Sequence, residues 1–351
     1  MKKLLVTMAM LAALAIPALP SGASAQATAT LGKSLKMVLV PKWLGSDRFS
    51  KMYDQVREGA EEAARELRNP APLQFEGPAP GHSVPGQIDI VTKATREGAN
   101  AIMISNNSGE QIVPALEAAH DKGIKVVSWD SPIQSAEGED VYIAQADFTT
   151  TGKVLAEMAL SILGADGGEF AILATTPGLA GPNAWIKAFQ EALKDPKYAK
   201  LKQVDLVYGS DELEPSYQQA RALAAKYPGL KLIVAPTSIA IAAAAKAMQD
   251  NKLCDRVKVT GLGVPSEMRG YTMEGCAPQF ALWSFVDLGY LSYYTAYLLA
   301  TDAIKAEEGQ EFTAGRLGQY KIAKDPNRPR GLRLVLGPFQ VYDKDNIGAI
   351  E

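Results

Sequence analysis

Histidine and cysteine are scarce in this sequence of 351 residues, which contains two of each. Neither His82 nor His120 has a second metal-ligating residue at the spacing that zinc sites use. The chain also lacks the G-x-S-x-G, P-loop and H-E-x-x-H motifs of common enzyme classes. We therefore expect no metal site, no cofactor and no catalytic residue, and we interpret the chain as something other than an enzyme.

An excess of positive charge is also missing. The chain has 36 basic and 39 acidic residues, a net charge of −3 and a pI near 5.7. Proteins that bind nucleic acid usually present a basic face, so we expect no nucleic-acid partner.

Long apolar runs are absent except at the start of the chain. Residues 4–20 are apolar, follow two lysines, and precede Ala23-Ser24-Ala25. A membrane-spanning helix needs about 20 apolar residues and rarely contains two prolines, whereas a signal peptide has this three-part layout. We expect a signal peptide at residues 1–25, cleaved after Ala25, and export of the mature chain; a membrane anchor is the alternative.

Short β-branched runs alternate with longer segments of helical spacing. The predicted strands of the first half are residues 35–40, 73–75, 101–104 and 125–129. Runs this apolar are typical of parallel strands buried on both faces. The alternation predicts βαβ units in a doubly wound sheet.

The same pattern restarts near residue 140 and continues to residue 283. Its predicted strands are residues 141–143, 169–174, 204–208, 232–234, 257–260 and 280–283. Ligands of open parallel sheets bind beyond the carboxyl ends of the strands, so two facing units would enclose a ligand and close about a hinge. We therefore expect an α/β fold of two doubly wound parallel-sheet lobes.

Residues at the predicted strand ends carry a family resemblance, in order, over nearly the whole mature chain. The stretches are Val40-Pro41-Lys42, Phe75-Glu76-Gly77-Pro78, Ser128-Trp129-Asp130-Ser131, Asn183-Ala184-Trp185, Ala235-Pro236-Thr237-Ser238, residues 260–268, and Trp283 with Asp287-Leu288-Gly289-Tyr290. Together they resemble periplasmic sugar-binding proteins of the ribose-binding type, and most closely the rhamnose-binding and autoinducer-binding branch.

The resemblance implies a type I periplasmic binding protein with a three-segment hinge. Lobe one is expected at residues 36–130 plus 284–311, and lobe two at residues 132–283 plus 312–351. The implied function is capture of a monosaccharide, with rhamnose as the first expectation, for the membrane permease of an ABC importer. The implied location is the periplasm, and we expect a monomer.

Sugar sites combine apolar platforms with convergent polar groups. The expected ligand-binding residues stand at strand ends or helix starts: Lys42, Trp43, Asp130, Asn183, Trp185, Pro236, Ser238, Gly263, Trp283 and Ser284. Asp130 can accept strong hydrogen bonds from sugar hydroxyls. The alternatives are a hinge hydrogen bond or helix cap for Asp130, a solvated surface role for Lys42, and a core role for the tryptophans.

Two departures from the branch bear on the ligand. Autoinducer-binding members carry an Asp-Gln pair where this chain has Gly181-Pro182, and Ser284 is smaller than the residue that relatives often have. The alternatives that stay open are an autoinducer receptor, a sensory sugar receptor feeding a chemoreceptor or kinase, and a secreted enzyme on the same scaffold.

The two cysteines precede two predicted strands of lobe two. Cys254 stands before residues 257–260 and Cys276 before residues 280–283. A right-handed crossover through the single helix between these strands would place them side by side and parallel. Adjacent strands lie about 4.8 Å apart, within the Cα separation that a disulfide requires. We expect a disulfide at the end of the lobe away from the ligand; two free thiols are the alternative.

Overall fold

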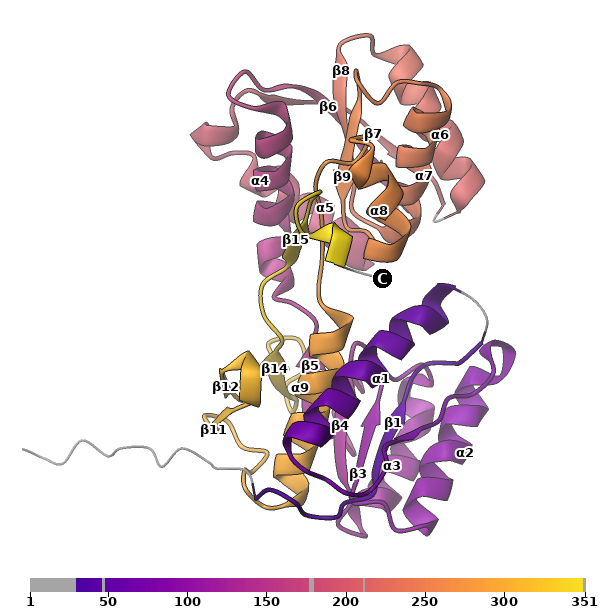
Figure 1. The fold of residues 1–351 in the computed structure, drawn as a ribbon, viewed down its shortest axis with the longest axis vertical. Helices are drawn as coiled ribbons and strands as arrows, with labels where there is room; N and C mark the ends of the chain where they lie inside the picture. Colours follow the sequence, from indigo (N-terminus) through magenta and orange to yellow (C-terminus); the bar gives the residue numbers. More distant parts are fainter. Residues whose placement is uncertain (1–29, 46–47, 177–179, 211, 350–351) are drawn as a thin grey trace, which may run out of the picture.

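The computed structural model describes residues 30–45, 48–176, 180–210 and 212–349. Within them the chain forms two lobes that stack along the long axis of the molecule (Figure 1). Both lobes are parallel sheets covered by helices, so the predicted fold class is confirmed. The predicted signal peptide lies outside the described residues.

Lobe one contains a seven-stranded sheet in the order β13-β14-β5-β4-β3-β1-β2, parallel except for the β13–β14 pair. Its strands are β1 (Met37–Val40), β2 (Gln74–Phe75), β3 (Ala101–Ile104), β4 (Lys125–Trp129), β5 (Val141–Ala144), β13 (Ala323–Lys324) and β14 (Leu332–Val335). Its helices are α1 (Arg48–Glu66), α2 (Ser83–Arg96), α3 (Val113–His120) and α9 (Phe285–Ala300).

Alternate residues of β1, β3 and β4 pack on opposite faces of the sheet. Met37 and Leu39 of β1 belong to a core with residues of α1 and α9, whereas Val38 and Val40 belong to a second core with residues of α2 and α3. Both faces are therefore covered, which explains why the strands are continuous apolar runs.

Lobe two contains a four-stranded parallel sheet in the order β7-β6-β8-β9. Its strands are β6 (Gly168–Ala174), β7 (Leu201–Tyr208), β8 (Leu230–Ala235) and β9 (Lys258–Gly261). Its helices are α4 (Thr151–Leu163), α5 (Ala180–Ala192), α6 (Leu213–Lys226), α7 (Ser238–Asp250) and α8 (Pro265–Met273). The antiparallel pairs β10 (Phe280–Leu282) with β15 (Gln340–Tyr342) and β11 (Glu311–Thr313) with β12 (Gln319–Lys321) complete the strands of the described chain.

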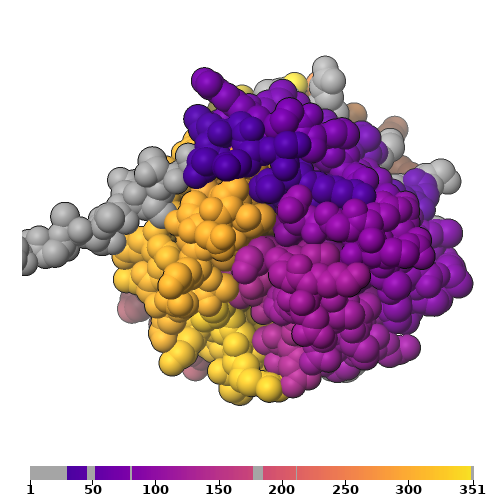
Figure 2. Space-filling model, turned by 90° about the horizontal axis from the view of Figure 1, so that it is seen from below, coloured from indigo at the N-terminus to yellow at the C-terminus, as the bar shows by residue number. Residues whose placement is uncertain are grey.

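The strand pairing corrects the expected lobe boundaries at two places. Residues 132–144 and 323–335 were expected in lobe two, but β5 pairs with β4 and β14 pairs with β5 in the sheet of lobe one. The four residues of β5 are all buried, and this sheet provides a neighbour on each side of them. Figure 2 shows the C-terminal part of the chain packed against its N-terminal part in this lobe.

The chain passes between the lobes three times. The connecting segments lie between β5 and α4, between β10 and α9, and between β14 and β15, at residues 145–150, 283–284 and 336–339. The three-segment hinge is thus present, with its first and third segments later in the sequence than expected. In the described part of the chain no helix is long and apolar enough to cross a membrane.

The strands that follow the two cysteines lie side by side and parallel, as expected, but a single bridge joins them. β10 pairs with β15, and one parallel bridge, Leu262 to Ala281, joins it to the end of β9. The chain turns into α8 soon after β9, so little strand remains opposite β10. Cys254 and Cys276 are nevertheless joined, with their Cα atoms 4.6 Å apart.

We predict that the expressed mature protein carries this disulfide. Its bond closes a loop with a sequence separation of 22, so reduction should lower the free energy of unfolding by about 3 kcal/mol. Thiol titration of protein unfolded without reductant should find no reactive thiol. Two thiols per chain before reduction would contradict the prediction.

Candidate functional site

The carboxyl ends of the lobe-one strands point toward lobe two (Figure 1). Lys42 follows β1, Ser105 follows β3 and Asp130 follows β4. Because β1, β3 and β4 are adjacent and parallel, their carboxyl ends bring these three side chains together.

Asp130 is the centre of this group. Its Oδ2 lies 2.7 Å from Lys42 Nζ and accepts a hydrogen bond from Ser105 Oγ at 2.8 Å. Its Oδ1 accepts a hydrogen bond from Gln145 Nε2 at 2.6 Å. The side chains of Lys42 and Asp130 are 22% and 18% exposed, so both can still be reached by a small polar ligand.

Trp43 extends the same edge with an aromatic surface. Its ring meets Tyr53 edge to face at 5.9 Å, and Tyr53 in turn meets the buried Trp129 at 6.0 Å. Trp43 is half-buried, whereas Tyr53 and Trp129 are 6% and 1% exposed. Trp43 therefore rests on a rigid aromatic support and keeps part of its surface accessible.

A second aromatic group lies at the hinge. Trp283 contacts Phe148 at 6.1 Å, Phe285 at 6.1 Å and Phe339 at 6.3 Å between ring centroids. Phe148 and Phe339 belong to the other two connecting segments, so Trp283 packs the three segments together. Trp185 of α5 stacks on Phe148 at 5.5 Å.

The other expected residues are spread along the lobe-two edge and the hinge. Pro236 is buried and Ser238, the first residue of α7, is half-buried. Ser284 caps α9, since its Oγ accepts a hydrogen bond from the Asp287 backbone N–H at 3.1 Å. A Cβ at Gly263 would lie 2.7 Å from Met268 Cγ, so close packing also favours glycine at that position. The side chain of Asn183 lies outside the described residues.

Comparison with known proteins identifies the family. Residues 37–304 match the sequence profile of the periplasmic binding protein domain. The chain belongs to that family.

Solved structures of other proteins are similar to this periplasmic binding protein. A sugar ABC transporter protein of Actinomyces odontolyticus is 31% identical with a TM-score of 0.80, over 90% of this chain and 97% of that one. An ABC transporter solute-binding protein of Clostridium phytofermentas, solved with L-rhamnose bound, is 30% identical with a TM-score of 0.66, over 90% and 98%. The LsrB protein of Clostridium saccharobutylicum, in complex with AI-2, is 21% identical with a TM-score of 0.68, over 90% and 100%, which shows the fold alone.

The structure adds polar residues that the sequence analysis missed. Ser105 and Gln145 both contact the Asp130 carboxylate, and both directly follow a strand of lobe one. The strand-end rule that selected Lys42 and Asp130 would have found Ser105 at the end of β3. Gln145 was missed because β5 was assigned to the other lobe.

No metal site accompanies these residues. Across the described residues, no group of three or more His, Cys, Asp or Glu side chains is placed to hold a metal ion. The imidazole of His120, one of the two histidines, pairs with Asp140, with Nε2 3.0 Å from Oδ2. The arrangement around Asp130 can bind polar groups through charged hydrogen bonds.

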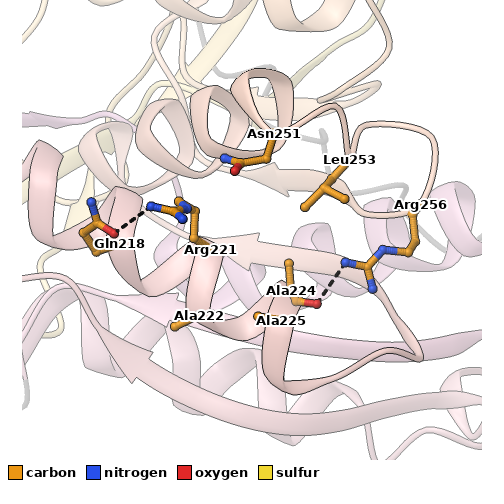
Figure 3. A pocket seen from close by; sticks show the side chains of 8 residues that line it. All are labelled: Gln218, Arg221, Ala222, Ala224, Ala225, Asn251, Leu253 and Arg256. Carbon is orange, nitrogen blue, oxygen red and sulfur yellow. Dashed lines mark hydrogen bonds between the residues drawn. The ribbon is translucent and has the colours of Figure 1, made fainter.

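A surface pocket of about 360 Å³ on lobe two is distinct from this site (Figure 3). Arg256 lines it and donates hydrogen bonds to the carbonyl oxygens of Ala224 at 2.9 Å and Pro228 at 3.2 Å. These carbonyls lie at the end of α6, before the amino end of β8, and so at the sheet edge opposite the one where ligands of such sheets bind. Arg256 therefore caps a helix rather than contributing to the candidate site.

Proposed function

We propose that this protein captures a monosaccharide between its lobes and delivers it to the membrane permease of an ABC importer. The observation that carries the proposal is the Asp130 group, in which a carboxylate, an ammonium and a hydroxyl converge at adjacent strand ends. Lys42 and Asp130 offset each other's charge, which suits a ligand that carries hydroxyls and no net charge. In this proposal the protein acts as a monomer in the periplasm and binds the sugar between its lobes. It releases the sugar chemically unchanged.

Aromatic residues supply the apolar part of the proposed site. Trp43 of lobe one and the Trp185–Phe148 stack at the hinge offer ring faces of the kind that pack against the C–H groups of a pyranose. Rhamnose is the first ligand to test, because the solute-binding protein solved with L-rhamnose is 30% identical over 90% of this chain.

A ligand screen tests the proposal. Mature protein, starting at Gln26, is heated with and without L-rhamnose, D-arabinose, D-tagatose, polyols and AI-2. A sugar that binds only the folded state adds about 2.7 kcal/mol at a hundredfold excess over its Kd, and so raises Tm. A shift with AI-2 alone would replace the sugar by an autoinducer, and recovery of a chemically altered sugar would contradict a binding role.

Asp130→Ala should weaken binding of the sugar found in that screen by about 1.5–3 kcal/mol, the range for a hydrogen bond to a charged group. Isothermal calorimetry gives the Kd of each variant. Asp130→Asn is tested beside it, since Asp130 has φ 61° and asparagine tolerates that conformation better than alanine.

Asp195→Ala is the matched control, because Asp195 is an exposed helix-capping aspartate of lobe two. Its Kd should equal that of the wild type. If folded Asp130 variants also bind with unchanged Kd, Asp130 does not belong to the site.

A further inference from the structure

Asp130 has an unusual backbone conformation for the residue at the centre of a site. Its φ of 61° lies in the left-handed region, which few residues other than glycine adopt. Such a conformation costs free energy and persists only where surrounding contacts hold it. The contacts that hold Asp130 come from the next strand and the segment after it.

Gln145 makes two of these contacts. Its Nε2 donates to Asp130 Oδ1 at 2.6 Å and to the Asp130 carbonyl oxygen at 3.0 Å. Gln145 is 6% exposed and is the first residue after β5, where the chain leaves lobe one for lobe two. One buried amide thus fixes both the backbone and the carboxylate of Asp130.

Tyr142 makes the third contact. Its hydroxyl lies 3.0 Å from the Asp130 carbonyl oxygen, to which it donates, and 3.3 Å from Gln145 Oε1. Burial raises the pKa of the phenol, so the hydroxyl remains a donor at neutral pH. The Arg328 guanidinium lies over the ring at 5.0 Å from its centroid and fixes the other side of Tyr142.

The protein contacts of the Asp130 carboxylate determine how many of its hydrogen-bond acceptor positions a ligand can use. A carboxylate has about four acceptor positions. Lys42 and Ser105 fill two at Oδ2, and Gln145 fills one at Oδ1. Among the described residues, Oδ1 therefore has one partner and keeps an acceptor position beside the amide of Gln145.

We propose that Tyr142 and Gln145 are positioning residues that hold Asp130 in its left-handed conformation and present one acceptor position at Oδ1 to a single hydroxyl of the bound sugar. The inference rests on the proposed function, because it assigns these residues to the site that Asp130 centres. It also specifies how the sugar is held: as long as Lys42 stays paired with Asp130, the carboxylate accepts a hydrogen bond from one sugar hydroxyl.

The test uses Tyr142→Phe and Gln145→Met, which keep side-chain volume and remove the donors. Tyr297→Phe is the control: it removes a buried phenol that donates to the Thr30 carbonyl oxygen at 2.8 Å, also in lobe one. With L-rhamnose as the probe, each test variant should raise the Kd about 5-fold to 10-fold, an effect of the size of a net buried hydrogen bond, and the control should not.

A double-mutant cycle separates positioning from general destabilisation. In an Asp130→Asn background, Tyr142→Phe should change the Kd by less than about twofold, because its effect passes through Asp130. An equal loss in both backgrounds would overturn the positioning role. If Asp130→Asn weakens binding while Tyr142→Phe and Gln145→Met do not, the inference fails and the proposed function stands; if Asp130→Asn itself has no effect, the proposed site fails.

Crystals of the sugar-free variants give a readout that does not depend on the ligand. In Gln145→Met we expect Asp130 to leave the left-handed region and the distance from Lys42 Nζ to Asp130 Oδ2 to exceed the 2.7 Å of the wild type. In Tyr297→Phe both should be retained. An Asp130 that keeps φ near 61° in both test variants overturns the inference even if L-rhamnose proves not to be a ligand.

Discussion

Gly59→Ala should lower the free energy of unfolding by about 3 kcal/mol, because it forces apart two helices whose backbones touch. A Cβ at Gly59 of α1 would lie 1.7 Å from the Val286 carbonyl oxygen of α9. The contact is reciprocal, since a Cβ at Gly289 of α9 would lie 1.8 Å from the Val56 carbonyl oxygen of α1. Backbone atoms cannot move aside as a flexible side chain can, so the whole crossing must shift.

The same change should also disturb ligand binding. α9 begins at Phe285, directly after the second connecting segment, so displacing it moves the hinge. Urea unfolding followed by circular dichroism measures the stability, and calorimetry measures the Kd.

Gly270→Ala is the matched control for the crossing. Gly270 lies inside α8 with nothing within 4 Å of the added Cβ. Alanine is the better helix former, so this variant should gain up to about 1 kcal/mol. A loss below about 1 kcal/mol for Gly59→Ala, or equal changes in the two variants, would mean that the helices separate easily.

The strands of lobe one were predictable because burial leaves a plain pattern in the sequence. The predicted runs at residues 101–104 and 125–129 coincide with β3 and β4. Both strands pair on each side and are covered by helices on each face, so most residues in them are apolar.

Which lobe receives a strand was not predictable in the same way. The four residues of β5 could pair with the edge of either sheet. Nothing in the local sequence indicates which of the two sheets the strand joins. The assignment depends on β14, which comes from residues far along the chain and pairs on the other side of β5. Contacts of this range are a property of the folded chain rather than of a local pattern.

The sequence was enough to select Asp130 and Lys42 as candidate site residues, but not Tyr142 and Gln145, which contact Asp130. Lys42 and Asp130 stand where parallel strands end, a position that topology alone identifies as ligand-facing. Tyr142 lies inside a strand and reads as core. Its hydroxyl acts on Asp130 only because β4 and β5 are neighbours, which the sequence analysis had excluded.

Trp283 makes packing contacts at the hinge beside its proposed role as a ligand platform. It was expected as a platform for the ligand, with a core role as the alternative, and it packs against Phe148 and Phe339 of the connecting segments and Phe285 of α9. Aromatic rings at three crossings give the hinge a packed centre. A contact with ligand remains a proposal, and a packing role is visible in the contacts.

Arg328→Met should lower the free energy of unfolding by about 3–5 kcal/mol, because it leaves buried carboxylates without their cation. Arg328 Nη1 lies 2.6 Å from Glu139 Oε1, and its Nε lies 2.7 Å from Asp325 Oδ2. The three side chains are 3%, 1% and 5% exposed. Arg328 Nη1 also donates to the Ile133 carbonyl oxygen at 2.6 Å, so the change frees a buried backbone acceptor as well.

The loss should depend on pH in a defined direction. Burial already raises the pKa of Glu139, and the Arg328 charge opposes that rise. Without Arg328 the pKa of Glu139 rises further, so the folded variant binds a proton that the unfolded chain releases. The deficit is therefore full above the folded-state pKa and shrinks as pH falls toward the ordinary glutamate value of about 4.3.

Arg330→Met provides the control, because Arg330 forms a surface pair with Glu137 in which the side chains are 70% and 42% exposed. Surface pairs of this kind contribute about 0–1 kcal/mol. Urea unfolding of both variants at about pH 8 and about pH 5 should give a large deficit for Arg328→Met that narrows at the lower pH, and a small one for Arg330→Met at both. Two outcomes would contradict the prediction: similar deficits for the two variants, or a deficit for Arg328→Met that grows as the pH falls. Either would show that Glu139 and Asp325 do not need the charge of Arg328.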